Sequence, residues 1–491
     1  MDDYNKLALK AVELQKKNNT QAAKKIYTDL IKVKRDPQIL RLLGIIEFNE
    51  KNYDESLNFL NESLKIDPNN SECYSNRGVT NFALKNIENA ILDYNKAISI
   101  DKKNYNAFFN LANLYKETDR FEEAIVNFNE AISINGKHYM AFHNRAVVKG
   151  LLFKFDDAIN DFNEALKINP EYSNSRFFKA ITQLKKGDYE NGWKNYEHRW
   201  ETTNFPSPKR QFKQPCWNGT DNLKDKIILI HGEQGLGDNI HFVRYFHLIK
   251  SKAKMAILQV DKKLVQLFKD SNFSSNIFSN NEKLPNFDIH CPLLSLPFKF
   301  STLIKNIPSP NKYLFPNKDR IIMWKKTFDN QFLNIGINWQ ASPNPDFDKG
   351  RSFKLKHFCD ISSLDRIRLY SLQKVNGLNQ INQMDKQFKL NIFNNFDEEA
   401  PFVDTAAIIE NLDLVVTCDT SIAHLSGAIG KKTFLLLQKN CEWRWLHDIN
   451  HSPWYDSVRI YRQTSQGDWK SVFKNVRNDI IKLYEYRKNK E

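Results

Sequence analysis

The sequence predicts a solenoid of helical hairpins followed by an α/β region with two parallel-sheet lobes. Three observations support this prediction. A repeat of 34 residues runs through the first 200 residues, and short apolar runs alternate with helical segments from residue 227 onward. The length of 491 residues also suits two to four domains at roughly 100–200 residues each.

Small residues recur at two positions of the repeat, and a bulky residue recurs at a third. The units start near Tyr4, Pro37, Ser71, Tyr105, Tyr139 and Ser173. The eighth position holds Gly44, Gly78, Ala112, Ala146 and Ala180, the twentieth Ala22, Ser56, Ala90, Ala124, Ala158 and Gly192, and the twenty-fourth Leu60, Tyr94, Phe128, Phe162 and Tyr196. Small residues let two helices approach closely, and the bulky residue fills the space against the next hairpin. The first unit has Lys10 at its eighth position, as expected of a terminal cap.

This pattern resembles the tetratricopeptide repeat (TPR) family, in which a helix pair repeats about every 34 residues. We expect about six units over residues 1–202. The resemblance implies a concave groove that binds an extended peptide or a protein partner. The alternative is that the repeats form only a spacer or a dimer scaffold.

Residues 203–224 contain three prolines, one glycine and no apolar periodicity, so we expect a linker. Its aromatic residues, including Phe212 and Trp217, favour a linker that packs on the next domain. Beyond it, apolar runs at 227–230, 256–258, 335–337, 369–372, 414–416 and 434–437 predict parallel strands that alternate with helices. Two Rossmann-like lobes fit this span: residues 225–325, and residues 326–491 with a C-terminal helix.

Charge is unevenly distributed along the chain. Residues 1–200 carry 30 basic and 28 acidic side chains, whereas the remainder carries 42 and 30. An anionic ligand or peripheral contact with an anionic membrane fits the second half. The alternative is a background excess of charge, because lysine outnumbers arginine about threefold and no dense basic run occurs. The sequence has no basic patch interleaved with aromatic residues, which is the pattern that would indicate nucleic-acid binding. The chain has no apolar run long enough for a membrane span, and its six cysteines form no CxxC pair, so we expect a cytoplasmic protein.

A glycine-rich loop, residues 231–239, follows the first strand. It lacks the Gly-Lys-Ser/Thr ending of a phosphate-binding P-loop, since Asp238 follows Gly237. An aspartate at this edge of the sheet can accept a proton from an incoming hydroxyl, while Gly235 and Gly237 let a bulky acceptor approach. The alternative is that Asp238 merely caps a helix that begins at Asn239.

A second strand-turn-helix stands at residues 414–430. Thr420 and Ser421 lie where a helix begins, and backbone N–H groups at such a terminus bind pyrophosphate well. His424 shares their helix face. Ordinary capping beside a packed histidine is the alternative.

Together, Gly237-Asp238-Asn239-Ile240-His241 and Asp419-Thr420-Ser421-Ile422-Ala423-His424 resemble the heptosyltransferases of glycosyltransferase family 9, which have the GT-B fold. Further segments, 232–238, 371–374, 404–407, 443–445 and 452–455, are similar to bacterial fusions of repeats to such a transferase, some of which glycosylate flagellin. The layout is more distantly similar to that of O-GlcNAc transferases.

The resemblance implies that Asp238 is the general base, on an acceptor loop that includes Gly235, Gly237 and His241. It implies that Asp419, Thr420, Ser421 and His424 hold a nucleotide-sugar donor. Arg351 stands where these enzymes place a cation against the diphosphate, and Lys374 is a second candidate. The donor is a co-substrate, so no bound cofactor is expected. Neither loop has an Asp-x-Asp motif nearby, so we expect chemistry that needs no metal.

The sequence thus predicts an inverting glycosyltransferase that acts on a protein, for example a flagellin-like one, captured by the repeats. The heptosyltransferases have no repeats and act on lipid-linked sugar, so their acceptor does not carry over. Two alternatives stay open. One is a polysaccharide or lipid-glycan transferase recruited by its repeats, and the other is a non-catalytic scaffold.

Overall fold

The computed structural model describes residues 2–202, 205–309, 311–342 and 350–488. The chain forms two compact units, residues 1–179 and 180–491. No helix of the described part is both long and apolar enough to cross a membrane.

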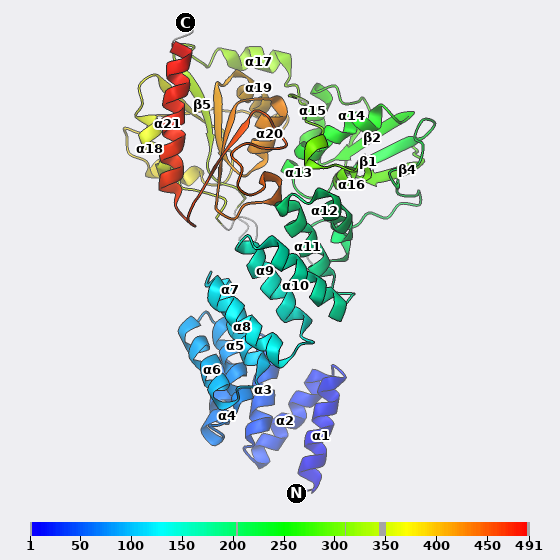
Figure 1. Ribbon diagram of the computed structural model, residues 1–491, viewed down its shortest axis with the longest axis vertical. Helices are drawn as coiled ribbons and strands as arrows, with labels where there is room; N and C mark the ends of the chain where they lie inside the picture. The colour runs from blue at the N-terminus through cyan, green and yellow to red at the C-terminus, as the bar shows by residue number, and fades with distance from the viewer. Residues whose placement is uncertain (1, 203–204, 310, 343–349, 489–491) are drawn as a thin grey trace. The chain divides into compact units, whose positions relative to one another are not determined.

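The first unit consists of antiparallel helical hairpins, and each helix packs on the next along the chain (Figure 1). The helices are α1 (Asp2–Lys16), α2 (Thr20–Val33), α3 (Pro37–Asn49), α4 (Tyr53–Ile66), α5 (Ser71–Ala83), α6 (Ile87–Ile100), α7 (Tyr105–Glu117), α8 (Phe121–Ile134), α9 (Tyr139–Leu151) and α10 (Phe155–Ile168). Helix α11 (Ser173–Lys186) begins in the first unit and ends in the second.

The small and bulky positions of the repeat pack against each other as predicted. A Cβ atom added to Gly44 would lie 2.7 Å from Leu60 Cγ, and one added to Gly78 would lie 2.6 Å from Tyr94 Cε1. Both partners are fully buried. These positions therefore fix the spacing between the two helices of a hairpin.

The first hairpin is shifted by one residue relative to this register. Ala11 and Ala23 are its buried small residues, whereas Lys10, which the 34-residue spacing places at the eighth position, is exposed. The period therefore shortens by one residue at the terminal unit, where no preceding hairpin constrains the packing.

The second unit contains two parallel sheets. The four-stranded sheet has the order β3-β2-β1-β4, and the six-stranded sheet has the order β10-β9-β8-β5-β6-β7. The strands of the first are β1 (Ile227–His231), β2 (Met255–Val260), β3 (Ile277–Ser279) and β4 (Ile289–Pro292). Those of the second are β5 (Leu333–Asn338), β6 (Ile367–Ser371), β7 (Leu390–Ile392), β8 (Leu414–Cys418), β9 (Thr433–Leu437) and β10 (Val458–Arg462).

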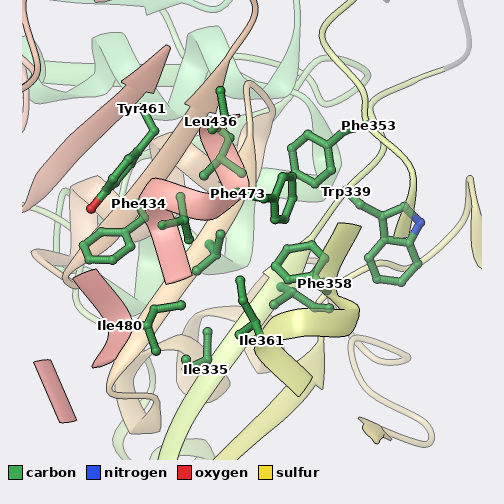
Figure 2. Close-up of a cluster of buried hydrophobic side chains, with 14 of the residues drawn as sticks. Ile335, Trp339, Phe353, Phe358, Ile361, Phe434, Leu436, Tyr461, Phe473 and Ile480 are labelled. Atoms are coloured by element: carbon green, nitrogen blue, oxygen red, sulfur yellow. The ribbon is translucent and has the colours of Figure 1, made fainter. Parts of the chain in front are cut away.

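The helices of this unit are mostly short. They are α12 (Tyr189–Tyr196), α13 (Leu236–Phe242), α14 (Phe246–Lys250), α15 (Lys262–Asp270), α16 (Leu296–Lys299), α17 (Lys318–Lys325), α18 (Cys359–Ser362), α19 (Val403–Asn411), α20 (Ser421–Ile429) and α21 (Trp469–Lys488). One face of the larger sheet is covered by α18 and α21, and Figure 2 shows the buried side chains between them, such as Phe358, Phe434 and Phe473.

All six predicted apolar runs form strands, each buried on both faces, which is typical of parallel sheets. Three short strands, β3, β4 and β7, and the edge strand β10 were not predicted, because their apolar runs are too short or too mixed. After the glycine loop, the chain forms α13, a 3₁₀ turn at Val243–Tyr245, and α14.

Residues 205–224 pack against the smaller sheet, and 203–204 lie outside the described residues. Trp217 is buried, and its N–H donates to the carbonyl of His290 at 2.7 Å. Cys216 thereby forms an isolated parallel bridge with His290 of β4. Phe212 packs against the rings of His231 and His290. This segment therefore covers the edge of the sheet next to β4.

Candidate functional site

Both predicted loops lie at positions where the order of strands reverses. In the smaller sheet, β2 and β4 flank β1 on opposite sides, and the glycine loop follows β1. In the larger sheet, β5 and β8 are neighbours from which the chain runs outward in opposite directions, and residues 419–421 follow β8. Crevices at such points, outside the carboxyl ends of the strands, are where open α/β sheets bind ligands.

The glycine loop turns sharply from β1 into α13. Gln234 has φ of 58°, and Gly232 approaches Asn239 so closely that an added Cβ would overlap Asn239 Oδ1. Asn239 donates to the carbonyl oxygens of Glu233 and Gly235, at 3.0 and 2.8 Å. The helix begins at Leu236 and not at Asn239, so Asp238 lies inside its first turn, and its Oδ2 accepts the Gly235 N–H at 3.0 Å.

Tyr196, the last residue of α12, and Arg199, three residues further on, form hydrogen bonds with this loop. Arg199 and Glu233 form a buried bidentate ion pair. Arg199 Nε lies 2.9 Å from Glu233 Oε2, and Arg199 Nη2 lies 2.7 Å from Glu233 Oε1. Glu233 also accepts the Leu294 N–H, and Gln234 donates to the Tyr196 hydroxyl at 2.9 Å. Burial raises the pKa of Glu233, and the charge of Arg199 opposes the shift. The loop is therefore positioned by polar contacts as well as by its glycines.

The second loop is organised around Asn338 at the end of β5. Thr420 is the N-cap of α20: its Oγ1 accepts the Ile422 N–H at 3.3 Å and donates to Asn338 Oδ1 at 3.0 Å. Asn338 in turn donates to Gln373 Oε1 at 2.9 Å. Ser421 is the first residue of α20, so the terminus lies at the carboxyl edge of the sheet, as the sequence predicts.

The structure brings the two predicted motifs together. A Cβ added to Gly237 would lie 3.1 Å from the His424 ring and 3.5 Å from Ser421 Cα. Gly237 is therefore needed for close contact between α13 and α20, a role different from the open acceptor approach that the sequence suggested for it. Gly235 keeps a looser environment, with only Asp238 near an added Cβ.

A tyrosine hydroxyl links the two motif histidines. His241 Nδ1 lies 2.9 Å and His424 Nδ1 lies 3.0 Å from the Tyr455 hydroxyl. Both rings are buried, His424 stacks on Trp445, and the Nε2 of His241 has no hydrogen-bond partner in the described part of the chain. Burial lowers the pKa of both histidines well below the ordinary value, so both are neutral near pH 7.

Charged groups surround the junction of the two loops. Asp238 forms an ion pair with Arg444, whose other arm donates to Glu442 at 2.7 Å. Asp419 is buried, and its Oδ2 accepts no hydrogen bond from the described residues. Burial raises the pKa of Asp419 to about 6, against the attraction of Arg351. Burial also raises the pKa of Asp238, and Arg444 opposes that shift.

Arg351 acts electrostatically on Asp238, Asp419 and His424, so it belongs to this cluster. Its Nε is buried and has no partner among the described residues. Lys374 is used elsewhere: its ammonium donates to the carbonyl oxygens of Phe396 and Asp397, at 2.7 and 3.2 Å. Of the two predicted cations, Arg351 is therefore the one whose charge reaches the two loops.

Reasoning from the sequence did not assign Arg444, Tyr455, Asn338 or Arg199 to the site. Arg444 and Tyr455 do fall within two of the segments that carried the resemblance, 443–445 and 452–455. Their proximity to the glycine loop, more than 200 residues away in the chain, has no local signal. Arg199 lies at the end of the predicted repeats, with its guanidinium over the rings of Tyr196 and Trp200.

A surface hollow of about 660 Å³ lies away from this cluster, at the amino ends of β9 and β10 beside α21. Its lining includes Lys432, Arg459 and Asp479, but Arg459 and Asp479 already pair with each other at 2.8 Å. Within the described ranges, no three His, Cys, Asp or Glu side chains are grouped as metal ligands.

Comparison with known proteins identifies the repeats. Residues 9–71, 71–104 and 93–126 match models of the tetratricopeptide repeat. The predicted repeats are thus confirmed there. Because such repeats bind peptides and proteins, this region is suited to protein interaction.

Protein FlbA of Caulobacter vibrioides is 24% identical to this chain over 324 residues, or 61% of this chain. The match spans 54% of FlbA, about half of its length. Among solved structures, MamA is 21% identical and covers 32% of this chain and 91% of its own, with a TM-score of 0.30. YrrB, described as a TPR protein with an unusual peptide-binding site, is 17% identical and covers 34% of this chain and 88% of its own, with a TM-score of 0.29. These structural likenesses are too low to carry an argument.

Proposed function

We propose that residues 180–491 form a glycosyltransferase of the GT-B type, which transfers a sugar from a nucleotide donor to a protein hydroxyl with inversion. The observation that carries this proposal is the meeting of two loops from two parallel sheets. The Gly237-Asp238 turn lies directly against the amino end of α20, where Asp419, Thr420, Ser421 and His424 cluster.

In the proposed reaction, Asp238 takes the proton of the acceptor hydroxyl as the hydroxyl oxygen attacks the anomeric carbon. The bond between that carbon and the nucleoside diphosphate breaks, and the diphosphate leaves with the bonding electrons. Arg351, Arg444 and the N–H groups that open α20 supply positive charge for the leaving group. A single base suffices for inversion, and the proposal includes no metal.

The loop bearing Asp238 is supported by features that favour a precise role. The Arg199–Glu233 pair and the Gln234–Tyr196 hydrogen bond fix the backbone before the helix. Burial that raises the pKa of Asp238 makes its carboxylate a stronger base than an exposed one. Lys374 is left out of the proposed donor site, because its ammonium already binds two carbonyl groups.

The repeats supply the proposed acceptor specificity. A TPR groove would present a polypeptide to the transferase, and the resemblance of the motifs to flagellin-modifying fusions makes a flagellin-like protein the first acceptor to test. A lipid-linked glycan acceptor would not require a peptide groove, although the net positive charge of residues 201–491 suits an anionic surface.

The first experiment is a thermal-shift screen with UDP, GDP, ADP and CMP, read by tryptophan fluorescence. We expect one nucleotide to raise the melting temperature by mass action, and Asp419→Ala to abolish that shift. In Asp238→Asn the shift should remain while sugar transfer falls about 10²–10⁴-fold. Asp225→Asn, at an exposed position of the same unit, is the matched control.

A failure of every nucleotide to stabilise the wild-type chain would contradict the proposal and favour a non-catalytic scaffold. Binding without transfer to any protein, but with transfer to a glycan, would retain the transferase and refute the protein acceptor.

A further inference from the structure

Arg444 serves two carboxylates at the centre of the site. Its Nη2 pairs with Asp238 Oδ1, and its Nη1 donates to Glu442 Oε2 at 2.7 Å. The guanidinium lies over the rings of Trp443, at 4.4 Å, and Phe242, at 5.5 Å. The side chain is only 5% exposed, so Asp238 is paired with a desolvated charge, and its Oδ1 is occupied by the guanidinium while the pair lasts.

Two buried donors in this site lack acceptors. The Nε of Arg444 and the Nε of Arg351 have no partner within the described part of the chain, and both atoms are shielded from solvent. A buried N–H without an acceptor is costly, and two guanidinium groups with such atoms in one cluster fit an anion that accepts from both. The cluster therefore has two unpaired N–H donors that an anionic ligand could satisfy.

We propose that Arg444 is exchanged between Asp238 and a bound phosphate-bearing anion: it pairs with Asp238 in the empty site and turns to the anion when the site is filled. The inference rests on the proposed function, because the anion it invokes there is the diphosphate of the donor. Its consequence is that the base becomes free only when the donor is in place, which protects the donor from premature attack by water.

The geometry makes the exchange physically reasonable. The flat rings beneath the guanidinium let it move in its own plane without losing stacking contact. Glu442, whose side chain is 42% exposed, anchors the other arm at the edge of the site. Asp238 keeps the Gly235 N–H as a partner when Arg444 leaves, so its carboxylate stays oriented.

The test measures equilibrium binding of inorganic pyrophosphate, and of whichever nucleoside diphosphate stabilises the chain, to four full-length variants. We expect Asp238→Asn to bind about tenfold more tightly than wild type, since a competing charge-assisted hydrogen bond is gone. Arg444→Gln should bind at least tenfold more weakly. In the double variant the gain from Asp238→Asn should vanish. Asp225→Asn, at an exposed position of the same unit, should change affinity less than twofold.

The double variant separates exchange from simple repulsion. If Asp238 only repels the anion, its replacement tightens binding equally or more when Arg444 is absent, and the inference is overturned. Unchanged or weaker binding by a folded Asp238→Asn also overturns it, as does the absence of binding by both probes to every variant. Should pyrophosphate follow the expected pattern while no nucleotide binds, the proposed function fails and the shared arginine stands.

Discussion

Replacing Asp419 by asparagine should stabilise the α/β unit at neutral pH, although the residue stands in the proposed donor site. Asp419 is 6% exposed, and no described residue donates to its Oδ2. Its pKa rises from 3.8 to about 6, chiefly through burial. The folded state therefore holds the proton more tightly than the unfolded chain, so the ionised carboxylate opposes folding.

The size of the effect follows from the two pKa values. Below about pH 3 the carboxyl is mostly protonated in both states, so it contributes little to the free energy of unfolding. The free-energy penalty of the ionised carboxylate on folding grows as the pH rises towards 6, and it is fully present above that pH. At about 1.36 kcal/mol per pKa unit, Asp419→Asn should raise the free energy of unfolding by about 3 kcal/mol at pH 7.5 and about 1 kcal/mol at pH 4.5.

Urea unfolding followed by tryptophan fluorescence measures this unit selectively, because all nine tryptophans lie between residues 193 and 469. The exposed Asp225→Asn is the control and should change stability by less than about 0.5 kcal/mol. A gain that is equal at the two pH values would refute the reasoning, because it would not come from ionisation. So would the absence of any gain at pH 7.5.

Two further predictions concern packing and buried polar groups. Tyr455→Phe removes the hydroxyl that joins His241 and His424 and should lower the free energy of unfolding by about 2–4 kcal/mol in the same fluorescence assay, since two buried nitrogens lose a partner; a loss no larger than that of the exposed Tyr486→Phe would contradict it. Gly78→Ala should destabilise the solenoid by about 1–3 kcal/mol, because the new methyl would meet Tyr94, and circular dichroism at 222 nm should show the loss. Gly136→Ala, where an added Cβ makes ordinary contact, is its control; equal effects of the two would refute the packing argument.

Local patterns in the sequence determined the elements and much of the candidate site. The 34-residue spacing of small residues gave the hairpins, since helix contact depends on side-chain size at fixed positions. Apolar runs predicted the buried strands. The glycine loop and residues 419–424 stood out because each joins a strand to a helix.

Only the tertiary structure decided which groups surround those loops. The pairing of Asp238 with Arg444 joins residues 206 positions apart, and Tyr455 contacts histidines of α13 and α20, two helices that follow strands of different sheets. Such contacts depend on how whole elements pack, which no short stretch of sequence records. The same holds for Lys374, a reasonable cation by its position after β6, whose ammonium folds back onto carbonyl groups of its own lobe. Burial of Asp419, and hence its raised pKa, likewise arises only when α20 and its neighbours close over the carboxyl end of β8.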